Sequence, residues 1–265
     1  MACERLPTAW LVDACWPEFA NHMRKHFGSE DRLHLPQRLR RSTRHDWPAF
    51  GLTRESRATL AALRRAVALR HLPGQGRALQ AELLKHERAL AECYARKLSY
   101  RHGHLVVSQP LLPHLWDLGV LGGRSFDVLM ERLPLDLLQD RLDEAKRHYP
   151  QSPTLADFRA PDAIIDNERR ALAQASWLIS PHSEIQALGG PRTLILDWSL
   201  PQSTAVAPSG RTILFPASAL ARKGLYALRE AAQGLDLTIA VTGRAREAAG
   251  DLWPGLRVVE AGEWP

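Results

Sequence analysis

From residue 104 onward, short apolar runs alternate with longer stretches in which apolar residues recur at helical spacing. Short apolar runs bounded by Gly, Pro or polar residues are typical of buried strands. We expect strands at 104–108, 126–130, 177–180, 193–196, 212–215, 237–241 and 256–260, with helices near 112–120, 135–147, 161–175 and 222–232. Because strands that alternate with helices form parallel sheets covered on both faces, the pattern predicts an α/β fold.

The amino-terminal part of the chain is predicted to add helices to this fold. Residues 53–69 and 75–98 carry apolar side chains at helical spacing, and Pro73 and Gly74 end the first of these helices. One face of the first helix holds Leu60, Leu63 and Val67. In the second helix, the side chains expected to face the core are Leu79, Leu83, Leu90, Tyr94 and Leu98.

A domain boundary is predicted at 201–210, which combine prolines and small residues without a periodic apolar pattern. Residues 1–200 then form an amino-terminal α/β domain, in which 8–13 are a strand or a buried turn and 29–52 a loop. About 55 residues, 211–265, follow the linker. Because a complete domain has about 100–150 residues, we expect the second domain to be incomplete in this chain.

The composition is that of a globular protein able to bury a core, with 45% hydrophobic and 24% charged residues. No apolar run approaches the ~20 residues that a membrane-spanning helix needs. Glu4 and Asp13 lie where a secretory signal would carry a cationic head and an apolar stretch. We therefore expect a cytoplasmic protein.

Positive charge is concentrated in residues 22–101, which hold 18 Lys and Arg against 7 Asp and Glu within a net charge of +6. Such an excess suits a nucleic acid, an anionic membrane or an acidic substrate. The chain has 30 Arg and 5 Lys, so a general preference for arginine explains the excess equally well. Without interleaved aromatic residues, nucleic-acid binding is not expected, whereas peripheral contact with an anionic membrane stays open.

No metal site or cofactor is predicted. The three cysteines are widely spaced, the eleven histidines do not recur at ligand spacing beside carboxylates, and no Asp-x-Asp cluster occurs.

The segment 213–232 carries the most chemical information. A strand leads through a short loop to a helix that begins near Arg222, Lys223 and Gly224. Unpaired amides at a helix amino terminus favour phosphate, and a glycine lets an anion approach the backbone closely. The alternative on spacing alone is a solvated surface pair of cations.

This segment resembles the start of the second domain in retaining glycosyltransferases of the GT-B fold, particularly glycosyltransferase family 4. The family shows an apolar strand, a short loop, a Lys-Gly pair, a helix with Leu and Ala, and a strand that ends in Gly. The match is carried in order by Lys223, Gly224, Leu228, Ala231 and Gly243. The resemblance covers about 125–265 and implies Rossmann-like parallel sheets, with a donor diphosphate bound by Ser218, Arg222, Lys223 and Gly224. The arginine common in the family after the first strand is replaced here by Ala217 and Ser218.

Residues 127–134 and 168–182 are similar to first-domain segments of that family. Ligands in open α/β sheets bind beyond the carboxyl ends of strands. This rule makes cleft candidates of Glu131, Arg132, Ser180 and His182. His182 would hold a sugar hydroxyl and Arg132 would stabilise the departing phosphate, so these two are the catalytic candidates. Each alone is more often structural than functional.

The resemblance implies a hexosyltransferase-like enzyme that moves a sugar from a nucleotide diphosphate donor to a glycan, lipid or small-molecule acceptor, with retention. The paired glutamates of the family and its glycine-rich loop after a first strand do not occur here. The alternative is therefore a non-catalytic binding or scaffold protein of the same fold, and turnover by this chain itself stays open.

Overall fold

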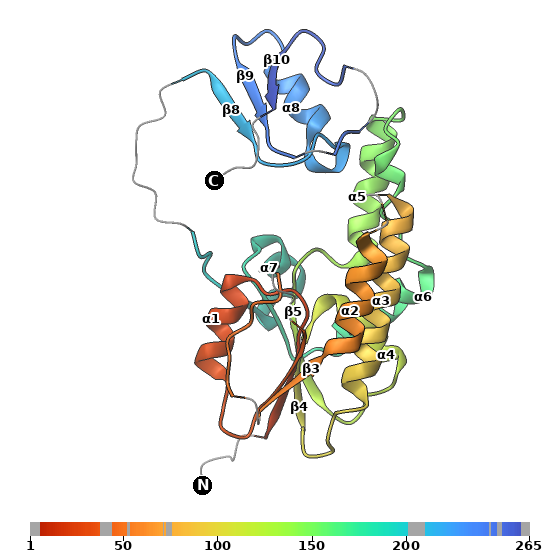
Figure 1. Cartoon of the computed structure of the whole chain (residues 1–265), viewed down its shortest axis with the longest axis vertical. Helices are drawn as coiled ribbons and strands as arrows, with labels where there is room; N and C mark the ends of the chain where they lie inside the picture. Colours follow the sequence, from red (N-terminus) through yellow and green to blue (C-terminus); the bar gives the residue numbers. More distant parts are fainter. Residues whose placement is uncertain are drawn as a thin grey trace. The chain divides into compact units, whose positions relative to one another are not determined.

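The computed structural model describes residues 6–37, 44–51, 54–70, 72, 76–200, 210–243, 245–247 and 251–260 (Figure 1). The chain divides into two compact units. The first comprises Met1–His71, Ala81–Asp136 and Ala160–Leu200, and the second Leu72–Gln80, Leu137–Arg159 and Pro201–Pro265. The predicted linker, apart from Gly210, lies outside the described residues.

The first unit contains a seven-stranded parallel sheet with the order β3-β2-β1-β4-β5-β6-β7. Its strands are β1 Thr8–Leu11, β2 Arg32–Pro36, β3 Glu55–Ala58, β4 His104–Ser108, β5 Ser125–Leu129, β6 Trp177–Ser180 and β7 Thr193–Ile195. The order reverses between β1 and β4, as in doubly wound Rossmann-like sheets. The predicted α/β fold with parallel strands is confirmed.

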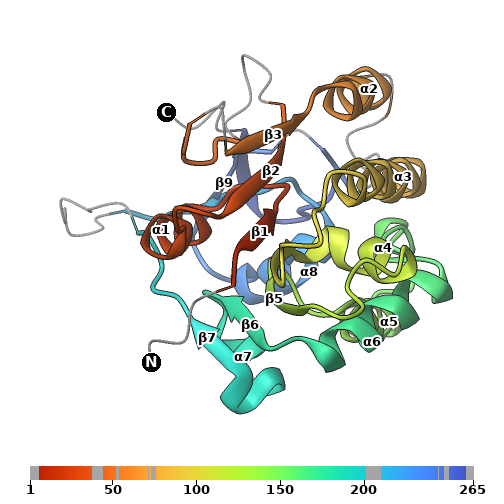
Figure 2. The same ribbon diagram turned by 90° about the horizontal axis from the view of Figure 1, so that it is seen from below.

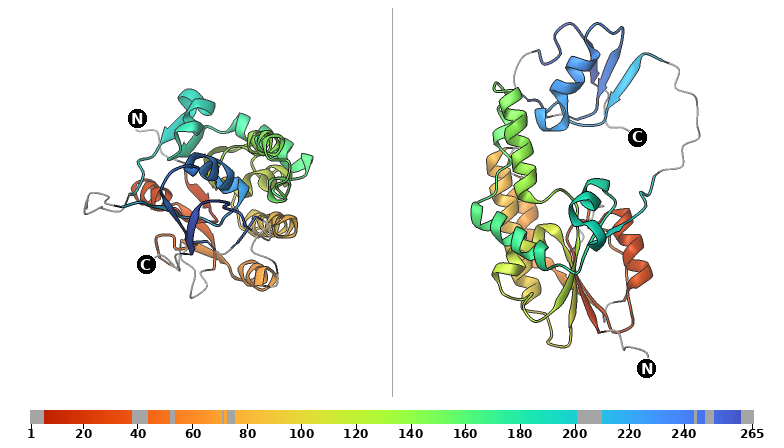
Figure 3. Two further views of the ribbon diagram at one scale, coloured as in Figure 1. Left: turned by 90° about the horizontal axis from the view of Figure 1, so that it is seen from above. Right: turned by 180° about the vertical axis from the view of Figure 1, so that it is seen from behind.

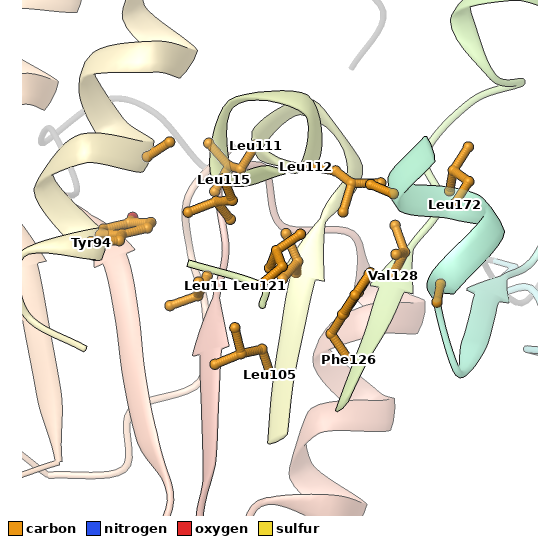
Figure 4. Packing of buried hydrophobic residues seen from close by; sticks show 14 of the residues in the cluster. Leu11, Tyr94, Leu105, Leu111, Leu112, Leu115, Leu121, Phe126, Val128 and Leu172 are labelled. Carbon is orange, nitrogen blue, oxygen red and sulfur yellow. The ribbon is translucent and has the colours of Figure 1, made fainter. Parts of the chain in front are cut away.

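Helices cover this sheet on both faces. They are α1 Pro17–His26, α2 Thr59–Arg70, α3 Arg77–Ala95, α4 Leu112–Asp117, α6 Asp162–Gln174 and α7 Ser183–Gly189, with short 3₁₀ turns at Gln109–Leu111 and Gly190–Arg192. Helix α5 Leu135–His148, apart from its first two residues, and the 3₁₀ turn Thr154–Ala156 belong to the second unit. Successive side chains of a strand point to opposite faces. Leu11 therefore packs with Tyr94 of α3 and Leu115 of α4 (Figure 4), whereas Trp10 packs with Phe19 of α1 on the other face. Figure 2 shows α1 on one side of the sheet and α3, α4 and α6 on the other.

Two sequence predictions about the amino-terminal part are wrong. The predicted loop 29–52 contains β2, where Leu33 and Leu35 are buried, and the predicted helix 53–69 begins only at Thr59, after β3. β3 has the sequence Glu-Ser-Arg-Ala, with no large apolar side chain, because it lies at the sheet edge and pairs with β2 through its backbone. An edge strand of this kind has no apolar signature.

The second unit contains a three-stranded parallel sheet with the order β10-β9-β8 (Figure 3). Its strands are β8 Thr212–Phe215, β9 Thr238–Val241 and β10 Arg257–Glu260, with a 3₁₀ turn at Ala221–Lys223 and helix α8 Leu225–Ala232. Leu225 of α8 packs with Phe215, Ile239 and Trp253 in the core of this unit. The predicted β-α-β arrangement is confirmed.

Candidate active site

Polar residues lie within two positions of the carboxyl ends of β1, β4, β5 and β6. Asp13 follows β1, Gln109 follows β4, Glu131 follows β5 and His182 follows β6. The strand order reverses between β1 and β4, and this is the position where open α/β sheets bind ligands. We use the name carboxyl-edge site for a cluster of ionisable side chains at this edge, which consists of Asp13, His45, Arg65, Glu87 and Glu131.

Asp13 forms a buried ion pair with Arg65 at the centre of the carboxyl-edge site. One guanidinium nitrogen of Arg65 in α2 donates to both carboxylate oxygens of Asp13, at 3.0 and 2.9 Å. Asp13 is 1% exposed and Arg65 8%. Burial alone would lower the pKa of Arg65, but the negative charge of Asp13 raises it above its ordinary value. Removal of either side chain would therefore leave the other polar group buried without its partner.

His45 lies against the same aspartate. Its Nδ1 is 3.4 Å from Oδ1 of Asp13 and 3.1 Å from the Asp13 carbonyl oxygen, which also accepts a bond from Trp47 Nε1 at 2.9 Å. Burial lowers the pKa of His45, which favours the neutral ring. Because both Asp13 oxygens are acceptors, Nδ1 carries the proton, and Nε2 of the neutral ring holds a lone pair. Nε2 is thus available as a general base.

Glu87 of α3 and Glu131 after β5 add two carboxyl groups that hold their protons unusually tightly. Burial and then the negative charge of Asp13 raise the pKa of each to about 8. Oε1 of Glu131 is buried and has no hydrogen-bond partner among the described residues. A carboxyl group with a pKa near the working pH can donate or accept a proton during a reaction.

The Gln109 side chain forms hydrogen bonds that hold the chain after β5. Its side-chain oxygen accepts from the amides of Glu131 and Arg132 at 3.0 and 3.1 Å, and its nitrogen donates to Glu168 at 3.2 Å. Glu168 is 1% exposed and also pairs with the Arg132 guanidinium at 3.1 Å. It accepts the amide of Leu135, the first residue of α5. The catalytic candidate Arg132 therefore already has a buried carboxylate partner.

The other catalytic candidate, His182, lies among aromatic rings. Its ring makes edge contacts with Trp16 and Trp198, at centroid distances of 5.5 and 5.0 Å. Its amide donates to Oγ of Ser180, which donates in turn to the Met130 carbonyl at 2.9 Å. These contacts link the ends of β5 and β6. The four candidates predicted for the first domain thus lie at the carboxyl ends of two neighbouring strands, Ser180 as the last residue of β6 and the others just after β5 or β6.

A cavity of about 190 Å³ adjoins the carboxyl-edge site. Its polar lining includes Arg44, His45, Arg65 and His86, and its apolar lining is mostly alanine and leucine from α2. A mostly apolar cavity with a few convergent polar groups is the usual form of a small-molecule site.

The donor-site candidates Ser218, Arg222, Lys223 and Gly224 all lie in the loop and 3₁₀ turn between β8 and α8 of the second unit. Arg222 and Lys223 are exposed, and Gly224 has a φ of +91°, a left-handed conformation that favours glycine. Gly243 at the end of β9 lies against this loop, because a Cβ added there would be 2.2 Å from the amide nitrogen of Ser218.

Glu247 occupies the first amide of the 3₁₀ turn. Its buried carboxylate accepts from the Ala221 amide at 2.7 Å and from the Thr154 hydroxyl at 2.6 Å, and it also bonds Ser152. Burial alone would raise the pKa of Glu247, but these hydrogen bonds hold it below its ordinary value. The amides of Lys223, Gly224 and Leu225 already donate to backbone carbonyls of this turn. A phosphate here would therefore rely mainly on the cations Arg222 and Lys223.

A second cavity, of about 350 Å³, lies at the carboxyl ends of β9 and β10. Ala219, from the predicted diphosphate loop, lines it together with Gly243, Asp251 and Trp253. A carboxylate beside an apolar wall suits a nucleoside, whose ribose donates hydrogen bonds. The Trp253 ring forms part of that wall, since it is 8% exposed and packs against Phe215.

The site residues predicted from local sequence patterns do not include Glu247 or four members of the carboxyl-edge site, Asp13, His45, Arg65 and Glu87. Asp13 follows an apolar run directly, and this position after a strand is the local signal that could have identified it. His45 and Arg65 have no such signal, because they reach Asp13 from distant parts of the sequence.

Within the described ranges, no group of three or more His, Cys, Asp or Glu side chains is arranged to hold a metal ion. Among the same residues, no helix combines the length and the apolar character needed to cross a bilayer.

A scan against protein-family models gives no match, and neither does a search of curated proteins. Several solved structures are similar, and two of them are glycosyltransferases by their descriptions. The glycotransferase of kitacinnamycin is 10% identical, with a TM-score of 0.41 over 96% of this chain and 71% of that one. Apo UGT2 of Phytolacca americana is 14% identical, with a TM-score of 0.43 over 98% of this chain and 73% of that one. Similarity at this level does not assign the chain to either protein's family.

Proposed function

We propose that this protein is a glycosyltransferase that moves a sugar, such as a hexose, from a nucleotide diphosphate donor to an acceptor hydroxyl. The observation that carries the proposal is the β8–α8–β9 arrangement of the second unit. There, Lys223 and left-handed Gly224 directly precede helix α8, and the same loop lines a cavity that suits a nucleoside. The sequence resemblance described above supports the assignment of this segment to the donor diphosphate.

The donor would bind in the second unit through both parts of this site. Arg222 and Lys223 would neutralise the diphosphate, and the cavity lined by Asp251 and Trp253 would hold the nucleoside. No metal is required in this scheme, because the two cations supply the positive charge that the leaving diphosphate needs.

The acceptor would bind at the carboxyl-edge site of the first unit. The cavity beside His45 and Arg65 offers space for a small molecule. Nε2 of His45 or the ionised carboxylate of Glu131 would accept the proton of the acceptor hydroxyl as its oxygen bonds the sugar and the diphosphate leaves. His182 would contact a sugar hydroxyl, as the resemblance implies. Retention at the anomeric carbon is part of the proposal for the same reason.

The second candidate function is a non-catalytic binding or scaffold protein of the same fold. Glu247 favours it, because a carboxylate already accepts the first amide of the turn that would hold the donor phosphates. A helix start that the protein's own anion occupies has less capacity for a second anion.

A transfer assay distinguishes the two candidates. A metabolite extract is incubated with UDP- or GDP-sugars, and new glycosylated species are sought by mass spectrometry. We expect products with the wild type and a loss of at least tenfold in Lys223→Ala, whereas Lys25→Ala, an exposed control on α1, keeps the activity. If a nucleotide sugar binds but no combination of extract and nucleotide sugar gives a product, the result supports the scaffold function instead.

A further inference from the structure

Helix α2 presents its large aliphatic side chains to solvent. Leu60, Leu63 and Val67, which we name the α2 ridge, are 70, 51 and 49% exposed. The helix instead buries Ala62 and Arg65. A helix on a protein surface usually turns its apolar stripe toward the core, so this reversed orientation leaves an apolar surface for a partner outside the chain.

The α2 ridge is flanked by arginines. At about 100° per residue, its three side chains lie within about 60° of one another around the helix, with Arg64 on one side and Arg70 on the other. Both arginines are exposed. Exposed aliphatic side chains beside exposed arginines match the two contributions to binding at a membrane interface, which are burial of apolar area and attraction to anionic lipids.

A groove of about 550 Å³ runs beside the ridge, between α2 and α3, which lie next to each other in Figures 1 and 2. Five cations line it against one acid, Glu92, and they are Arg57, Arg64, Lys85, Arg96 and Lys97. Arg57 pairs with Glu55 and Lys85 with Glu82. Arg64, Arg70 and Arg96 have no ion-pair partner among the residues that the structure describes. Their charge is therefore available to an external anion.

We propose that the α2 ridge and the cationic groove beside it dock the protein on the surface of an anionic lipid bilayer. The aliphatic side chains would enter the headgroup boundary, and the arginines would contact lipid phosphates. A second copy fits less well, because a twofold contact through this face would bring the two sets of cations together. Nucleic acid fits less well too, since the ridge offers aliphatic side chains and no ring for base stacking.

Vesicle co-sedimentation tests this proposal, which does not depend on the sugar-transfer function. The full chain is mixed with vesicles of phosphatidylcholine and phosphatidylglycerol in equal parts, or of phosphatidylcholine alone. One variant replaces Leu60, Leu63 and Val67 with serine. A second replaces Arg64, Arg70 and Arg96 with glutamine. A matched control combines Leu188→Ser with Arg170→Gln, two exposed positions on other helices of the same unit.

We expect the wild type and the control to bind the anionic vesicles and not the neutral ones. At about fivefold per cation, the triple arginine variant should bind about a hundredfold more weakly, and the serine variant should lose binding. Circular dichroism spectra of the variants should match that of the wild type, because only exposed side chains are changed. Absence of wild-type binding, or equal binding by the serine variant, overturns the proposal. Sedimentation that shows a dimer in the wild type and a monomer in the serine variant also overturns it, since a second copy then covers the ridge.

Discussion

Replacement of Glu131 by glutamine should change how the stability of the protein depends on pH. Burial and the charge of Asp13 raise the pKa of Glu131 from 4.5 to about 8. Between these values the folded protein keeps a proton that the unfolded chain releases. The free energy of unfolding contributed by this group is therefore fully present below about pH 4.5 and is lost as the pH rises to about 8.

The magnitude follows from the size of the shift. A difference of one pKa unit corresponds to about 1.4 kcal/mol, so the full shift sets an upper limit of about 5 kcal/mol. Glu131 is partly open to water, which lowers the cost of its charge, and we expect about 2 kcal/mol. Glu131→Gln cannot ionise. At pH 8.5 it should therefore be more stable than the wild type by about this amount, and at pH 5 the two should be nearly equal.

Urea unfolding at a series of pH values measures this difference, and carbon-13 NMR of labelled glutamates gives the pKa directly. The missing resonance in Glu131→Gln identifies the group. Glu92→Gln is the control, because the Glu92 side chain is 40% exposed and pairs with Arg88. A Glu131 resonance that titrates near pH 4.5, or equal stability of wild type and variant at pH 8.5, would show that Glu131 does not hold its proton in the folded protein.

Three further substitutions test contacts within the first unit or within the second. Asp13→Asn should cost about 3 kcal/mol in urea unfolding because it leaves Arg65 buried without a counter-charge, and adding Arg65→Met should restore part of the loss. Glu247→Ala should cost about 3 kcal/mol and speed amide exchange at its partners, since four hydrogen bonds to its carboxylate are lost. Gly243→Ala should lower the melting temperature, because its Cβ would overlap Ser218; an unchanged melting temperature would contradict the close approach.

The sequence predicted those parts of the fold that local patterns determine. The strands β4, β5 and β6 are apolar runs buried in the sheet, so each has a signature within its own residues. β3 has none, because backbone pairing with β2 holds it in place. Helix α2 was located by its spacing, but spacing alone does not say which face is inward.

Of the carboxyl-edge site, the sequence identifies only Glu131, because it lies just after a strand. The same rule identifies His182, which lies two residues after β6. It does not identify the partner of Asp13, because Arg65 lies 52 residues away on a helix whose apolar stripe suggested a different orientation. Likewise, the contact between Glu247 and Ala221 joins the segment after β9 to the turn between β8 and α8. Contacts between distant parts of a chain leave no local pattern in a single sequence.

The most direct test of the proposed function is a calorimetric titration of the full chain with UDP, GDP and their sugar conjugates. If the loop at Arg222 and Lys223 holds the donor diphosphate, at least one nucleotide should bind. Lys223→Ala should then weaken that binding about tenfold or more, while Lys25→Ala should leave it unchanged. Equal affinity in Lys223→Ala and wild type, or no binding of any nucleotide, would contradict the assignment of this loop to the donor.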